Sequence, residues 1–181
     1  MKKRLFCMLL ALSMAAALAA CGGGSENPNG QSTEGQALPT QSAGGQTEAG
    51  GYVFAVSKAN GYTVAIDDNM ADVLAALGEP LSYFEAASCA FEGLDKTYTY
   101  SGFVITTRPD GDQDYVNSIR LTDDSVVTPE GVYIGCSEDE VTAAYGEGSR
   151  TETVISYTKG NSAMNFVLEG GKVISIEYLP A

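Results

Sequence analysis

Three carboxylates in one short stretch have the spacing of a cation site. Asp110-Gly-Asp-Gln-Asp114 begins like the D-x-D-x-D part of a calcium-binding loop. An EF-hand also needs Gly at the sixth position of this loop and a bidentate Glu at the twelfth, where this chain has Tyr115 and Leu121. The stretch also lies between two expected strands instead of two helices. We therefore expect a polar hairpin tip, with weak cation binding as the alternative.

Two cysteines in the part of the chain that is expected to fold are candidates for a disulfide. Cys89 lies within Ala86–Phe91, and Cys136 lies close to Ile134. A pair of thiols in an exported domain can be oxidised to a disulfide, and reduced cysteines act as small buried apolar side chains. Both alternatives stay open for Cys89 and Cys136. A nucleophilic cysteine would need a base, and the chain has no His to supply one.

The composition excludes several other classes of function. Without His there is no imidazole triad and no metal site built on imidazole. The 23 acidic residues outnumber the 10 basic ones, and this negative charge repels nucleic acids and anionic lipid headgroups. Carboxylate pairs such as Asp123/Asp124 are able to do acid–base chemistry, but no motif places them in a pocket. We expect no enzyme, no cofactor, no metal site and no nucleic-acid partner.

The N-terminus has the pattern of an export signal. Lys2, Lys3 and Arg4 precede the apolar stretch Leu5–Ala20, which is shorter than the ~20 residues that span a bilayer. The stretch ends in Leu18-Ala-Ala-Cys21, which resembles the lipobox of bacterial lipoproteins. In that family the thiol receives a diacylglyceryl group and the preceding peptide bond is cut. The resemblance implies a signal peptide over 1–20 and an acylated Cys21 in the cell membrane, on its extracytoplasmic face.

The segment that follows is expected to be a disordered tether. Residues 22–51 are rich in Gly, Gln, Ser and Thr, and Leu38 is their only large aliphatic residue. Such a segment buries too little apolar surface to offset the entropy lost on ordering. With the lipidated Cys21 it forms a tether over 21–51, and the folded domain is expected over 52–181.

The folded part contains two pairs of similar blocks. Asp72–Glu79 resembles Glu140–Glu147, and Val116–Ile119 resembles Val173–Ile176. The first pair has the apolar spacing of a short helix and ends near a glycine that can terminate it. Patterns of alternation and turn residues predict strands at 52–57, 62–66, 86–91, 95–101, 103–108, 115–122, 151–158, 162–168 and 172–179. We therefore predict an α+β fold, with two helix-plus-antiparallel-strand repeats (about 61–124 and 129–181) forming a sheet with short helices on one face.

These blocks carry a second resemblance. Ile134–Val141, followed by Tyr145-Gly146, is similar to the helix segment of the β-lactamase-inhibitor-protein-like superfamily, which includes the SmpA/OmlA lipoproteins. The similarity extends over about 62–179. It implies a tandem-repeat, non-catalytic domain that holds another protein on a concave sheet face or on loops. No motif matches the residues that grip β-lactamase, so that activity is not implied.

The tyrosines of the expected strands can be interpreted as a recognition surface or as core packing. Tyrosine is abundant in recognition surfaces, but it is also common in half-buried strands, and we expect packing for most of them. Those in or beside the expected strands are Tyr98, Tyr100, Tyr115, Tyr157 and Tyr178. The leading expectation is a lipid-anchored, non-catalytic domain that binds another extracytoplasmic protein. The alternatives are a sensor of a small ligand or cation at the membrane and, third, a hydrolase that uses carboxylates alone.

The lipid anchor gives the first testable prediction. Cys21→Ala removes the thiol that would be acylated, and two acyl chains are needed for stable membrane attachment. We expect the variant to move from the detergent phase to the aqueous phase when a detergent extract of the producing cells is separated. Unchanged partitioning would remove the lipoprotein assignment.

Overall fold

The computed structural model describes residues 50–181. The expected signal peptide, Cys21 and almost all of the expected tether lie outside this range. The strands are β1 (Val53–Val56), β2 (Tyr62–Ala65), β3 (Ser82–Ala87), β4 (Leu94–Tyr100), β5 (Phe103–Asp110), β6 (Gln113–Leu121), β7 (Ser149–Arg150), β8 (Val154–Lys159), β9 (Ser162–Glu169) and β10 (Lys172–Pro180). The helices are η1 (Ser57–Ala59), α1 (Met70–Leu77) and α2 (Glu138–Tyr145).

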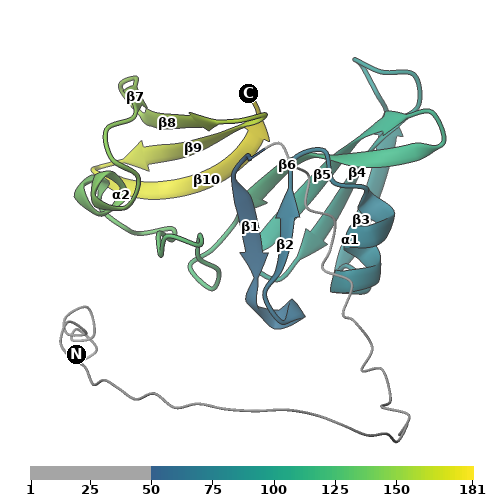
Figure 1. The fold of residues 1–181 in the computed structure, drawn as a ribbon, viewed down its shortest axis with the longest axis horizontal. Coiled ribbons are helices and arrows are strands. Elements are labelled where there is room, and N and C mark those ends of the chain that lie inside the picture. The colour runs from purple at the N-terminus through teal and green to yellow at the C-terminus, as the bar shows by residue number, and fades with distance from the viewer. Residues whose placement is uncertain (1–49) are drawn as a thin grey trace, which may run out of the picture. The chain divides into compact units, whose positions relative to one another are not determined.

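Eight of the strands form one antiparallel sheet, and β1 and β2 form a separate hairpin (Figure 1). The order in the large sheet is β3-β4-β5-β6-β10-β9-β8-β7. Its two halves meet where Ile119–Leu121 of β6 pair with Ile176–Tyr178 of β10. The outermost strands are therefore β3 at one edge and β7 at the other.

The core lies on one face of this sheet. Strand register aligns a row of side chains across seven strands: Tyr83, Tyr98, Ile105, Ile119, Tyr178, Met164 and Tyr157. Figure 1 shows the β1–β2 hairpin over the middle of the sheet and the two α-helices toward its ends. These elements contribute Phe54, Val64, Met70, Val73 and Val141 to the same buried cluster. The row is buried from Tyr98 onward, whereas Tyr83 at its outer end is exposed.

Both α-helices are short and are limited by side-chain caps. The Asn69 side chain accepts a hydrogen bond from the Ala71 N–H at the start of α1, and Ser137 and Glu140 form a capping box at the start of α2. Each helix has eight residues and ends at a glycine with positive φ, Gly78 or Gly146. Helices of this length depend on packing against the sheet.

The predicted α+β class is wrong. In the described part of the chain 49% of the residues are in strands and 14% in helices, which is a β-rich fold and not a set of helix-plus-strand repeats. The two helices bury only Met70, Val73 and Val141, so they do not form a layer. The β1–β2 hairpin covers much of the sheet instead. The similar blocks Asp72–Glu79 and Glu140–Glu147 mark short helices that end at glycines, which is too little to define the fold class.

The individual strands agree better with expectation. Period-2 alternation located β9 and β10, and the predicted strands 52–57 and 62–66 correspond to β1 and β2. The expected strand 86–91 is wrong, because β3 ends at Ala87 and the chain then turns before β4. All six residues of β3 are exposed, so the segment lacks the alternation that burial on one face produces.

The junction between β6 and β10 yields a stability prediction. Ile119 is fully buried there, and Ile119→Ala should lower the free energy of unfolding by about 2–5 kcal/mol through lost apolar contact and a residual cavity. Arg120 is the next residue of the same strand and is exposed, so Arg120→Ala is the matched control, with a change within about 0.5 kcal/mol. Equilibrium unfolding in urea measures the free energy of unfolding of both variants. Equal decreases in the two variants would contradict a core position for Ile119.

Candidate functional site: an apolar pocket beside an exposed edge strand

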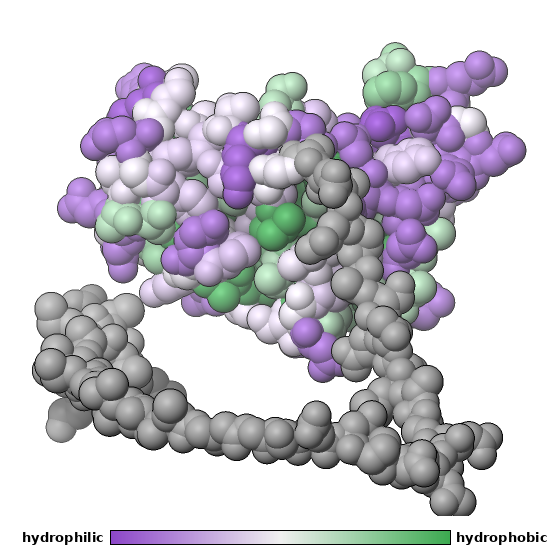
Figure 2. All heavy atoms as spheres, in the orientation of Figure 1, coloured by the Kyte–Doolittle hydropathy of each residue, from purple (hydrophilic) through white to green (hydrophobic). Residues whose placement is uncertain are grey.

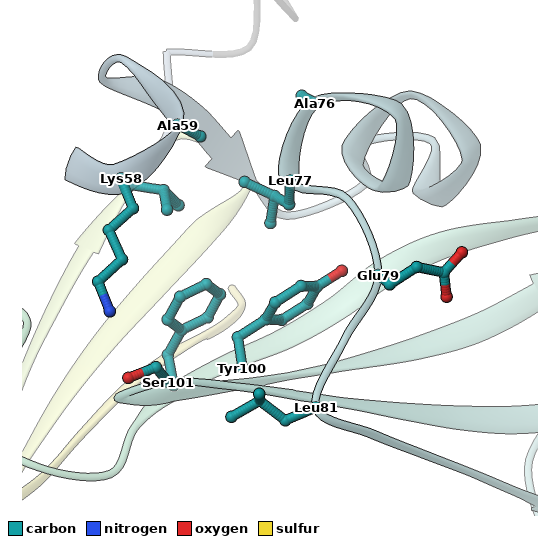
Figure 3. Close-up of a pocket in the computed structure, with 10 residues that line it drawn as sticks. Lys58, Ala59, Ala76, Leu77, Glu79, Leu81, Tyr100 and Ser101 are labelled. Atoms are coloured by element: carbon teal, nitrogen blue, oxygen red, sulfur yellow. The ribbon is translucent and has the colours of Figure 1, made fainter.

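An apolar pocket of about 240 Å³ lies between η1, the end of α1 and the turn of the β4–β5 hairpin (Figure 3). Its lining residues are Val56, Lys58, Ala59, Ala76, Leu77, Glu79, Leu81, Tyr100, Ser101 and Phe103. The Tyr100 and Phe103 rings stack with centroids 5.1 Å apart. Pockets for drug-sized ligands are typically ~300–1,000 Å³. The volume here suits a single side chain or a small apolar group.

Few polar groups face this pocket. The Tyr100 hydroxyl donates a hydrogen bond to the Gly78 carbonyl at 3.2 Å, which ties β4 to the end of α1, and burial raises the pKa of this hydroxyl. In Figure 3 Lys58 extends along one side, and Glu79 points away. Glu79 is also the only carboxylate among the lining residues, whereas hydrolysis by carboxylates alone uses two. The charged residues that line the pocket are therefore one Lys and one Glu.

The pocket continues into the edge strand β3. Leu81 lines the pocket, directly precedes β3 and is 75% exposed. Within β3, Phe84 is 66% exposed and Tyr83 is 49% exposed. The opposite edge of the sheet, β7, has only two residues, Ser149 and Arg150. The two edges therefore differ in length and in apolar character.

The β3–β4 hairpin concentrates exposed apolar side chains. Five of the nine exposed large hydrophobic residues in the described part of the chain lie between positions 81 and 94. We call them the β3 edge surface: Leu81, Tyr83, Phe84, Phe91 and Leu94. Figure 2 shows a small hydrophobic group at this end of the molecule, at the upper right, among hydrophilic residues. Such a cluster with a polar surround is typical of an interaction site.

The β3 edge surface is also acidic. Positions 79–95 contain Glu79, Glu85, Glu92 and Asp95 and no Lys or Arg. The next residue, Lys96, is already bound to Asp114 at 2.6 Å. Unbound negative charge therefore dominates this edge.

Two other contacts influence the charges at this edge. Arg108 lies over the Phe91 ring, but its guanidinium is bound to Asp67 at 3.0 Å. The Tyr83 hydroxyl donates a hydrogen bond to the Glu85 carboxylate, which raises the pKa of Tyr83 to about 12. Tyr83 therefore stays neutral at physiological pH and adds no further negative charge to the surface.

The expected cation loop forms the polar β5–β6 hairpin tip. Asp114 is bound to Lys96, and the Asp110 carboxylate lies 3.8 Å from Arg108. Within residues 50–181, no three His, Cys, Asp or Glu side chains lie close enough together to hold a metal ion. In the carboxylate pair Asp123/Asp124, which is a separate candidate, Asp123 accepts a hydrogen bond from the Ser125 N–H at 2.8 Å and so takes part in a local turn. Among the described residues, the carboxylates of Asp110–Asp114 are therefore not arranged as a calcium site.

The two cysteines are both free. Cys136 is buried in the core, in keeping with the expectation for a small apolar side chain, whereas Cys89 is exposed in the loop after β3. The disulfide alternative is not formed in this structure. Cys21 lies outside the described residues, so its lipidation stays a prediction.

Most of the strand tyrosines pack inside the molecule. Tyr98, Tyr157 and Tyr178 are buried, which confirms the packing interpretation for them. Tyr83, which sequence analysis missed, is the exposed one on β3. A signal was present in the adjacent aromatics Tyr83 and Phe84, because neighbouring strand residues point to opposite faces and one core cannot bury both.

Two further observations concern membrane-spanning helices and similarity to known proteins. None of the helices in the span 50–181 has the length and apolar character needed to cross a bilayer. Comparison with known protein families, curated proteins and solved structures finds no match to the chain. Its function must therefore be argued from the pocket and the β3 edge surface.

The exposure of Phe84 gives a prediction that separates a binding role from a folding role. Phe84→Ala should change the free energy of unfolding by less than about 1 kcal/mol, the range of strand propensities. Phe103→Ala, at a buried position in the core, should cost about 3–5 kcal/mol. Urea unfolding of both variants measures this difference. A comparable loss in Phe84→Ala would show that the side chain supports the fold.

Proposed function

We propose that this chain is an exported, lipid-anchored, non-catalytic domain that binds another extracytoplasmic protein through the β3 edge surface. The observation that carries the proposal is the clustering of Leu81, Tyr83, Phe84, Phe91 and Leu94 on one edge of the sheet. Leaving these side chains in water forgoes the ~25 cal/mol per Å² that burial contributes. Their exposure is best explained by a partner that covers them.

The types of residue on this surface support a protein partner. Interfaces are enriched in Tyr and Phe, and large side chains that fill pockets supply most of the binding energy. Here the surface offers Tyr83 and Phe84 as anchors, and the neighbouring pocket can receive one apolar side chain of the partner. An exposed apolar patch beside a small cavity is therefore well suited to bind the surface of another protein.

The expected anchor is consistent with this role. Acylation at Cys21 would hold the domain on the extracytoplasmic face of the membrane, and the tether would give it freedom of orientation. The negative charge of the chain disfavours adsorption to anionic headgroups. The β3 edge surface would then remain open to other proteins.

The pocket supports one alternative function. Stacked rings of Tyr100 and Phe103 with Lys58 at the side could hold a small anionic aromatic or aliphatic ligand, as in a sensor at the membrane. Such a ligand would contact the pocket and leave Phe84 uncovered. The two functions therefore differ in what happens at Phe84.

Site-specific photo-cross-linking in the producing cells tests the proposal. A benzophenone amino acid replaces Phe84 in one variant and Thr158, an exposed residue of the distant strand β8, in the control. We expect position 84 to give one reproducible protein adduct after illumination and position 158 to give none. Absence of an adduct at 84, or the same adducts at both positions, would contradict a protein-binding role for β3.

A further inference from the structure

We infer that β3 binds its partner by strand addition, and that the added segment is extended and cationic. This inference rests on the proposed function and specifies how the β3 edge surface is used. It draws on the backbone of β3, on the weak protection of this edge, and on the charges around it.

The backbone of β3 presents unpaired hydrogen-bonding groups. Its register with β4 is regular from the pair Ser82/Thr99 to the pair Ala87/Leu94, and the Ser88 N–H donates to the Gly93 carbonyl at 3.0 Å. Alternation in an antiparallel pair then directs the backbone groups of Tyr83, Glu85 and Ala87 away from β4. Within residues 50–181 no other strand pairs with this side of β3. It is a ready template for one more strand.

Natural edge strands are usually protected against such pairing, and β3 has only one of the protecting features, the charge on Glu85. Protection comes from short length, charged residues (Lys above all), Pro residues and bulges. The opposite edge, β7, is short, with two residues. In contrast, β3 has six residues, contains no Lys or Pro, and pairs with β4 without a bulge. Its single charge, on Glu85, already accepts a hydrogen bond from Tyr83.

The surrounding charges select the partner. Glu79, Glu85, Glu92 and Asp95 have no basic residue among them, and the neighbouring Lys96 is bound to Asp114. A segment with Lys or Arg would gain attraction along this edge. A second copy of the chain would bring the same carboxylates together, and like charges on paired strands are destabilising. A cationic segment of another protein is therefore favoured over self-pairing.

The side chains of β3 define the pattern of that segment. Tyr83 and Glu85 point to one face of the sheet, and Phe84 points to the other. An added strand would place basic residues beside Glu85 and apolar residues beside Phe84. Its end near Leu81 would reach the pocket with an apolar side chain. The expected ligand is thus an extended segment that alternates basic and apolar residues.

Peptide binding to the full chain, purified in a non-ionic detergent, tests this mode. The probes are two dye-labelled peptides of eight residues, one alternating Lys with Val and one alternating Glu with Val. We expect the Lys/Val peptide to raise the fluorescence anisotropy at low salt, with weaker binding as salt increases. The Glu/Val peptide should give no change. Equal binding of the two peptides would overturn the inferred charge preference.

Two substitutions at one position test the backbone contact. Ala87→Pro removes an N–H that points away from β4, and Ala87→Val keeps it. We expect the proline variant to weaken Lys/Val binding by about tenfold, which corresponds to ~1.4 kcal/mol, and the valine variant to bind like the parent chain. An unchanged affinity in Ala87→Pro would overturn strand addition. Equal unfolding midpoints of the two variants verify that both fold.

A charge reversal gives an independent result should the proline variant fail to fold. Glu85→Lys should weaken binding of the Lys/Val peptide and strengthen binding of the Glu/Val peptide, and unchanged preferences would overturn the inference. Self-association of the parent chain through β3 in sedimentation would also overturn it, in favour of a second copy. If position 84 cross-links to a protein in cells while these peptide results fail, the proposed function stands and only its mode is wrong.

Discussion

The outer strand of an antiparallel sheet leaves every second backbone N–H and C=O without a partner. The large sheet has two such edges in the described part of the chain, and they differ in length and in exposed apolar residues. One edge ends in the two-residue strand β7, whereas the other is the fully exposed strand β3 with Tyr83 and Phe84. The asymmetry gives the molecule one surface suited to binding another strand.

The rest of the fold keeps that edge in place. The β6–β10 pairing joins the two halves of the sheet, and the β1–β2 hairpin covers the core face with Phe54 against Phe103 at 5.0 Å. Burial is complete in the centre and ends at β4, where Tyr98 is the last buried member of the row that continues to Tyr83. The pocket beside Leu81 forms where η1 and α1 meet this boundary. The core row thus ends at Tyr83 of the β3 edge surface, whereas Phe84 lies on the opposite face of the sheet.

The sequence predicted those parts of the fold that follow from local patterns. Alternation located β9 and β10, and the apolar spacing of Glu140–Glu147 located α2, because burial on one face leaves a pattern in nearby residues. The predicted fold class was wrong because the similar blocks around Gly78 and Gly146 indicate two helices but not how few residues these helices bury. The β3 edge surface was missed because β3 is exposed on both faces and has no alternation. The position of the pocket depends on packing between segments distant in sequence, which no local pattern records.

Amide hydrogen exchange on the chain in membranes of the producing cells, where the proposed anchor would hold it, tests most directly whether a partner covers the edge strand. Exchange is measured by mass spectrometry for residues 81–94, once in membranes of the producing cells and once in the purified chain, with β9 as the internal reference. A bound strand shields backbone amides from exchange. Slower exchange of this segment in the membranes, with unchanged exchange in β9, is the predicted result. Equal exchange of residues 81–94 in the two preparations would contradict a partner at β3.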